Sequence, residues 1–295
     1  MDSNINYQVD AKENLYFYIR LVVSVGLYYL LFKLIMLSFQ SEKIPAASVF
    51  VLYFYAFAII LFIFFRFGIL MGHLKGNAVR INKNQFPDLY QIVVKQTRQL
   101  GINSVPAVYI MQSGGVLNAF AARFLGRNYI VLYSEIVEAA YEQDKSILEF
   151  IIAHELGHIK RNHMIKNILL MPSLFVPFLG TAYSRACEYT CDNIGHALCP
   201  YGVKGGLLIL ASGKTIYKKV NLNEFIRQES TEDGFWKWFA EKVSSHPNLT
   251  KRLAAFSEVR NSTGVPQQTE MVNEPIAEPV VVVQKEDDHS RYLPH

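Results

Sequence analysis

The chain has 295 residues, of which 51% are hydrophobic and only 18% are charged, a balance richer in apolar residues than that of most soluble proteins. Its formal net charge of +4 does not indicate a nucleic-acid-binding protein, because no basic block carries the interleaved aromatic residues that stack on bases. We therefore expect the lipid bilayer as a partner, and no nucleic acid.

Two apolar stretches near the N-terminus predict a transmembrane helical hairpin. After a leader of residues 1–14, residues 15–39 are mostly apolar and aromatic, and residues 49–71 are more uniformly so. Each stretch is long enough, at roughly 20 residues, to cross a bilayer as a helix. Arg20 and Lys33 lie toward opposite ends of the first stretch, where we expect their side chains to extend to the membrane interface. The alternative is a helical hairpin buried inside the protein.

Basic residues that flank the hairpin predict its orientation. The loop 40–47 contains only Lys43, whereas the exit of the second stretch carries Arg66, Lys75, Arg80 and Lys83. Such residues concentrate on the cytoplasmic side. We therefore expect a multi-pass protein of the cell membrane whose remaining domain faces the cytoplasm. The leader has more acidic than basic residues, so we do not expect a cleaved signal.

The segment 76–260 is predicted to be a mainly helical α+β domain with a small sheet. Periodic apolar spacing predicts helices over residues 87–100, 134–141, 146–163, 235–243 and 249–259. Short runs of β-branched and aromatic residues predict strands over 106–111 and 129–133. Residues 118–124 between them predict an edge segment, to which an extended peptide substrate can add as a strand. From residue 261 to 295 no helical period remains, and we expect a disordered tail.

The segment His154-Glu155-Leu156-Gly157-His158 follows an apolar run and is the most informative part of the sequence. Residues four positions apart lie on one face of a helix, so His154 and His158 can bind one zinc ion. Glu155 lies between them, near the water that such a zinc activates, and is the candidate general base. The alternative is a structural helix with satisfied histidines, and the spacing favours the metal.

A catalytic zinc normally has three protein ligands, so a third must come from elsewhere in the chain. If the helix continues, His163 lies about 180° around it from His154 and points away. Glu188 is the better candidate. It shares one helical face with Asp192, four residues on, so Glu188 can bind zinc while Asp192 orients a ligand imidazole. A solvated acidic face is the alternative, and the nearby zinc-type helix favours the metal.

The three cysteines Cys187, Cys191 and Cys199 are predicted to be small core residues. Cys187 and Cys191 share a helical face, but Glu188 is about 100° from Cys187, so one helix cannot direct both at one ion. Their odd number and unpaired spacing indicate no disulfide framework and fit a reducing compartment.

Four segments together resemble membrane metallopeptidases of the HtpX and CAAX-prenyl-protease type. They are His154 to His163, residues 184–192, Asn118-Ala119-Phe120 and Ser245-His246-Pro247. The resembling proteins are gluzincins, in which a Glu is the third zinc ligand. The resemblance implies one Zn²⁺ per chain.

By this resemblance the zinc ligands are His154, His158 and Glu188. Glu155 is the general base, and Asp192 is the partner of a ligand imidazole. The resemblance also implies that Asn118 belongs to the substrate-binding edge and that His246 stabilises the oxyanion.

The function that this implies is that of a membrane-anchored zinc metalloendopeptidase. It would hydrolyse peptide bonds of peptide or protein substrates by metal-activated water, in quality control of membrane or unfolded proteins. Two alternatives stay open: a membrane scaffold or holdase that has the fold without turnover, and a zinc hydrolase that processes lipidated peptides. The intact Glu155 argues against the first.

Residues 164–183 separate the two metal-binding segments and are largely apolar. A single membrane crossing here would place Glu188 on the side opposite His154, which is incompatible with a zinc–oxygen bond of about 2 Å. HtpX-type proteins have two crossings between these motifs, and this chain is too short there for two. We therefore expect a membrane-dipping hairpin, a helix along the bilayer surface, or buried core.

Overall fold

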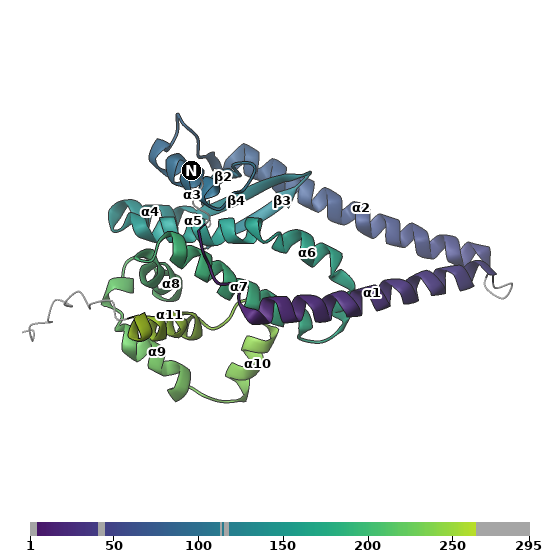
Figure 1. Cartoon of the computed structure of the whole chain (residues 1–295). Helices are drawn as coiled ribbons and strands as arrows, with labels where there is room; N and C mark the ends of the chain where they lie inside the picture. Colours follow the sequence, from purple (N-terminus) through teal and green to yellow (C-terminus); the bar gives the residue numbers. More distant parts are fainter. Residues whose placement is uncertain (1–4, 41–44, 113, 115–117, 264–295) are drawn as a thin grey trace, which may run out of the picture. The chain divides into compact units, whose positions relative to one another are not determined.

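The computed structural model describes residues 5–40, 45–112, 114 and 118–263 (Figure 1). It begins with two long apolar helices, α1 (Ala11–Gln40) and α2 (Ala46–Asn77), which converge near the stacked rings of Phe39 and Tyr53. Nearly all of the predicted tail lies outside the described residues.

Both helices are long and apolar enough to cross a membrane. Only 6% of the most apolar window of α1 is buried within the protein, and none of that of α2. They are therefore not core helices, which argues against the buried hairpin.

A four-stranded mixed sheet follows, in the order β1-β2-β4-β3. Its strands are β1 (Val79–Arg80), β2 (Ala107–Met111), β3 (Ala119–Phe124) and β4 (Arg127–Tyr133). β2 and β4 are parallel, whereas β1 pairs with β2 and β3 pairs with β4 in antiparallel fashion. β3 therefore forms an edge of the sheet, as predicted for this segment.

The remaining elements are mainly helical, which confirms the predicted α+β class. They are α3 (Pro87–Gln99), α4 (Ser134–Glu142), α5 (Lys145–Lys160), α6 (His163–Leu169), the 3₁₀ helix η1 (Met171–Phe175), α7 (Leu179–Leu198), α8 (Gly202–Ser212), the 3₁₀ helix η2 (Tyr217–Lys219), α9 (Leu222–Thr231), α10 (Phe235–Val243) and α11 (Leu249–Thr263).

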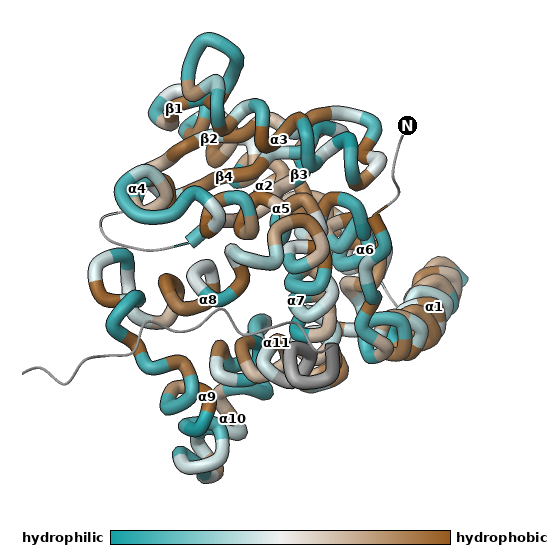
Figure 2. The backbone as a smooth tube through the Cα atoms, turned by 60° about the vertical axis from the view of Figure 1, so that its left-hand side comes forward, coloured by the Kyte–Doolittle hydropathy of each residue, from teal (hydrophilic) through white to brown (hydrophobic). Residues whose placement is uncertain are grey.

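The central strand β4 is buried on both faces, between which its side chains alternate. Ile130 and Leu132 of β4 belong to the main core, with α3, α4, α5 and α8. Tyr129 and Val131 point to the other face, where Met71 near the C-terminal end of α2 covers them. β2 and the part of β4 after Arg127 and Asn128 are accordingly largely hydrophobic (Figure 2). The second apolar helix is thus anchored directly on the sheet.

The predicted helix 146–163 ends earlier than expected, at Lys160. Asn162 adopts the left-handed conformation with φ 55°, and α6 then begins at His163. Asn is one of the few non-glycine residues that tolerate this conformation, so it permits the break. The expectation that His163 points away on a continuous helix is therefore wrong.

Candidate active site

Helix α5 carries His154, Glu155 and His158, and the sequence explains why it forms. Asp144 caps its N-terminus by accepting a hydrogen bond from the backbone N–H of Ser146. The apolar run before the motif is buried in the main core. The motif is thereby fixed on a rigid element of the domain.

Small residues bring α7 close to α5. A side chain added at Gly157 would place its Cβ 3.1 Å from Cys191 Sγ and 3.3 Å from Cys191 Cα. Gly195, one turn further along α7, lies similarly against the ring of Phe150. This close packing lets Glu188 on α7 reach the two histidines on α5.

The donor atoms of the three candidate ligands lie at distances that suit one zinc ion. The Nε2 atoms of His154 and His158 are 3.3 Å apart. Glu188 Oε2 lies 3.4 Å from His154 Nε2, and Glu188 Oε1 lies 3.3 Å from His158 Nε2. Ligands bonded at about 2.0–2.2 Å to a tetrahedral zinc are roughly 3.3–3.6 Å apart. The three side chains therefore fit one zinc ion.

Asp192 orients the first of these ligands. Its Oδ1 lies 2.9 Å from His154 Nδ1, which leaves Nε2 of that ring to face the other ligands. Asp192 is itself fully buried and accepts two hydrogen bonds, of 2.6 and 2.7 Å, from the Arg252 guanidinium. Arg252 also lies 3.3 Å from Glu188 Oε2. One buried cation thus compensates both acidic groups of α7.

The site is electrostatically suited to a cation. Burial lowers the pKa of the His154 imidazole, but Asp192 and Glu188 outweigh burial and raise this pKa to about 10. Burial raises the pKa of the Glu188 carboxyl group, but the two imidazoles and Arg252 outweigh burial and hold this pKa well below its usual range. A zinc ion bound at His154 would take the place of a proton, so metal binding would be coupled to proton release.

A second set of buried groups lies behind His158. Its Nδ1 is 3.1 Å from His163 Nδ1, and His163 Nε2 is 3.2 Å from Glu13 Oε1 of α1. Burial lowers the pKa of His163 to about 4, so its ring is neutral and has a nitrogen that can accept a hydrogen bond from His158. Glu13 also accepts hydrogen bonds from Arg161 and lies 3.8 Å from Lys166. Both candidate histidine ligands therefore have a neighbouring side chain that can orient the ring.

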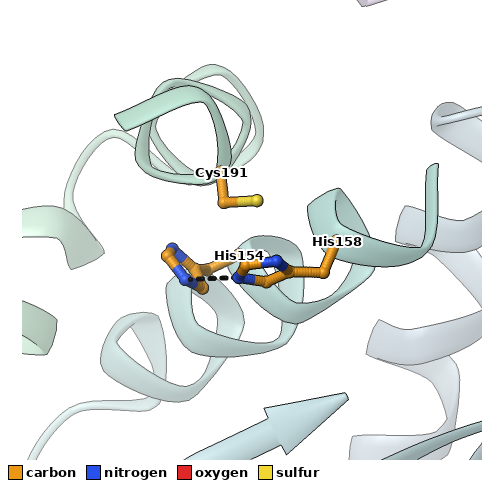
Figure 3. Close-up of side chains that lie close together, drawn as sticks. All are labelled: His154, His158 and Cys191. Carbon is orange, nitrogen blue, oxygen red and sulfur yellow. Dashed lines mark hydrogen bonds between the residues drawn. The ribbon is translucent and has the colours of Figure 1, made fainter. Parts of the chain in front are cut away.

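Cys191 also lies close to the two histidines, as Figure 3 shows. Its thiol comes from α7 and is 3.8 Å from His163 Nδ1. Burial and nearby carboxylates raise the pKa of this thiol well above its usual value. Glu188 presents one carboxylate oxygen to each of the two imidazoles, which favours Glu188 as the candidate third ligand. All three cysteines are buried and unpaired.

Three further residues, Glu155, His246 and Asn118, were predicted to belong to the site. Glu155 is buried on α5 beside the ligands. His246 Nε2 lies 3.6 Å from Glu188 Oε1, and its side chain is 63% exposed. Asn118 precedes the edge strand β3, where its backbone oxygen accepts a hydrogen bond from Tyr133. β3 in turn contacts α5, the helix that carries His154 and His158.

Arg252 and Glu13 are functional candidates that the sequence did not reveal, and His163, weighed above only as a third ligand, is a further candidate as the partner of His158. Arg252 has a recognisable signal, because it shares the apolar helical face of Leu249 and Leu253, where a cation needs a buried partner. Glu13 has a weaker one, as an acidic residue just ahead of an apolar stretch. Arg252 and Glu13 each contact residues more than 50 positions away in the sequence, and the spacing of residues within one helix does not reveal such contacts.

Comparison with known proteins agrees with this geometry. Residues 83–176 match peptidase family M48, a range that includes both histidines and ends before Glu188. The chain is 29% identical over 237 residues to plastoglobule-localized metallopeptidase 48, chloroplastic, of Arabidopsis thaliana; the match covers 74% of this chain and 61% of that protein. It is 25% identical over 209 residues to a protease HtpX homolog of Helicobacter acinonychis (strain Sheeba), covering 57% of this chain and 66% of that protein.

Among solved structures, the crystal structure of S. mikatae Ste24p covers 82% of this chain and 66% of its own, with 15% identity and a TM-score of 0.46. The chain thus spans about three fifths to two thirds of the length of these relatives. The family match and the HtpX relatives confirm the resemblance that the motifs indicated. Residues 83–176 thus match peptidase family M48, and the chain is similar to the HtpX proteases.

Proposed function

We propose that the chain is a membrane-anchored zinc endopeptidase that cleaves peptide or protein substrates at the cytoplasmic face of the cell membrane. The observation that carries this proposal is the mutual contact of His154, His158 and Glu188, backed by Asp192. The M48 match and the protease names of the relatives support the same reaction class. Quality control of membrane or unfolded proteins is the role we propose for it.

The residues divide the reaction between them. Zinc, when bound, supplies Lewis-acid activation of water and of the scissile carbonyl. Glu155 takes the proton of the attacking water and delivers it to the leaving amine. His246 donates to the developing oxyanion, an interaction worth roughly 3–4 kcal/mol when a well-placed donor is lost. The free edge of β3, beginning after Asn118, binds the substrate backbone as an added strand.

The metal assignment predicts one zinc ion per chain, lost from the His154→Ala, His158→Ala double variant. Glu188→Gln removes the anionic ligand and is expected to lower zinc affinity sharply, whereas Cys191→Ala, at the neighbouring candidate, should retain zinc. Metal analysis of the purified protein after dialysis against a weak chelator measures this. Zinc retained by Glu188→Gln but lost from Cys191→Ala would assign the third ligand to the thiol instead.

Activity on unfolded casein and on a prenylated peptide separates the proposed endopeptidase from the alternatives. We expect detergent-solubilised wild-type protein to cleave casein. Cleavage of the prenylated peptide alone would indicate a hydrolase for lipidated tails. Binding of casein without cleavage, with zinc present at one ion per chain, would favour the holdase.

The proposed topology predicts which surface sites are accessible from outside the cell. Gln40 at the end of α1 is exposed and is expected outside, whereas Tyr201, 84% exposed on the domain, is expected inside. On intact cells, Gln40→Cys should react with an impermeant maleimide, and Tyr201→Cys should react only after lysis. The wild type gives the background, because its cysteines are buried. The reverse labelling pattern would place the domain outside the cell.

A further inference from the structure

The segment between the two metal-binding helices has an unusually apolar and exposed surface. No residue between Lys166 and Arg185 is charged. The segment folds as α6, η1 and the start of α7, so it turns back on itself and does not continue as one helix. Its exposed large side chains are Ile168, Leu169, Met171, Leu174, Phe175, Val176 and Phe178, of which Phe175 is 87% exposed. Buried core is therefore excluded for this part of the chain.

These residues lie alongside α1, well into its apolar stretch (Figure 1). Arg20 donates hydrogen bonds to Asn167 Oδ1 at 2.6 Å and to Ser173 Oγ at 2.8 Å. Further along α1, the Tyr28 hydroxyl donates to the backbone oxygen of Leu169 at 3.2 Å. Arg20 is buried by these contacts, so the expectation that it extends to the membrane interface is wrong.

The two anchoring residues define the depth of the segment. Arg20 and Tyr28 lie roughly 8 and 20 Å along the helix axis from Leu15, where the apolar stretch begins, at about 1.5 Å per residue. The hydrocarbon core of a bilayer is about 30 Å thick. If α1 crosses the membrane, the segment beside it lies within the hydrocarbon region.

Several backbone groups of the segment have the partners that lipid cannot provide. Carbonyl groups at the end of a helix lack partners within it, and in lipid no water replaces them. Here Tyr28 donates to the carbonyl of Leu169, while Arg20 and the Ser173 hydroxyl donate to that of Leu170. The backbone N–H groups of Ser173 and Val176 bond within the turn, and its two prolines have none.

We propose that residues 168–178, the re-entrant segment, insert into the acyl region of the bilayer beside α1 without crossing it. This inference rests on the membrane-spanning hairpin of the proposed function. The charged residues at the two ends of the uncharged stretch are held by the protein, since Lys166 lies 3.8 Å from Glu13 and Arg185 donates hydrogen bonds to backbone oxygens of the segment 241–244. Helix α7, which carries Glu188, begins directly after the re-entrant segment, and the metal site is thereby held at the membrane surface.

Depth-dependent fluorescence quenching tests the insertion on the full-length protein in phosphatidylcholine vesicles. Single cysteines replace Phe175 in the re-entrant segment, Phe62 in α2 and Tyr201 on the domain, all highly exposed, and each is labelled with a small fluorophore. Vesicles with brominated acyl chains quench labels in lipid, and aqueous iodide quenches labels in water. Zinc content shows that each variant has folded.

We expect the Phe175 label to lose as much fluorescence in brominated vesicles as the Phe62 label, and to resist iodide. The Tyr201 label should respond only to iodide. Iodide quenching at Phe175 with lipid quenching at Phe62 would overturn the inference while leaving the hairpin intact. Resistance of Phe175 to both quenchers would overturn it too, since another protein surface, such as a second copy, would then cover the segment. Iodide quenching at Phe62 would instead remove the hairpin itself.

Discussion

Glu155→Gln is expected to lower kcat for casein by roughly 10²–10⁴-fold while zinc stays at one ion per chain. Gln keeps the size and hydrogen-bonding capacity of the side chain but cannot accept the proton of the attacking water. The substitution leaves His154, His158, Glu188 and their contacts unaltered, so metal binding should not change. Steady-state cleavage and metal analysis on the same preparation measure both quantities.

Glu149→Gln is the matched control for this prediction. It makes the same chemical change on the same helix α5, outside the metal-binding motif. Its kcat should stay within a few-fold of wild type. Wild-type cleavage by Glu155→Gln would show that another group acts as the base, and loss of zinc from it would show that Glu155 helps to hold the metal.

Arg252→Met is expected to lower the free energy of unfolding by about 3–5 kcal/mol, because it leaves buried carboxylates without their cation. Asp192 and Glu188 are both buried, and Arg252 lies within 2.6 Å of the first and 3.3 Å of the second. Met retains much of the apolar stem, so the loss reports the charge more than the packing. Thermal unfolding in detergent with a chelator present removes any contribution from zinc affinity, and the midpoint should fall by roughly 10 °C.

Arg227→Met provides the comparison. Arg227 also pairs with a carboxylate, Glu224, at 3.0 Å, but its side chain is 67% exposed. Exposed pairs contribute about 0–1 kcal/mol, so this variant should unfold close to the wild-type temperature. Adding Asp192→Asn to Arg252→Met should recover part of the lost stability. Equal midpoints for Arg252→Met and the wild type would mean that the carboxylates do not need this cation.

The site residues that could be predicted are those whose relationship is local. His154 and His158, like Glu188 and Asp192, are four residues apart, and helical geometry alone places each pair on one face. Glu188 could be ranked as the candidate third ligand because it shares a helical face with Asp192 and lies near the zinc-type helix in the sequence. The edge position of β3 was also predictable, because β3 lies in the sequence between two apolar segments that were themselves predicted to be strands.

The rest depended on tertiary contacts. His163 was misplaced because the prediction assumed a continuous helix, and the single residue Asn162 in the left-handed conformation redirects the chain. Arg20 was misplaced because an apolar surrounding suggested lipid, whereas its partners come from Asn167 and Ser173, far along the chain. A lone charge in an apolar helix indicates that a partner exists, but does not indicate which segment supplies it.

The burial of Glu13 limits how far the chain can be truncated from its N-terminus without disturbing the domain. Its carboxylate, in the first turn of α1, faces Arg161, His163 and Lys166 of the protease domain. A truncated chain that begins after α2 would lack both apolar helices. Arg161, His163 and Lys166 would then lose the Glu13 carboxylate that they face. The ring that supports His158 would then lose its own support. Helix α1 thus supports the candidate metal site through Glu13, and we expect a fragment without the hairpin to be an altered protein and not a detached copy of the domain.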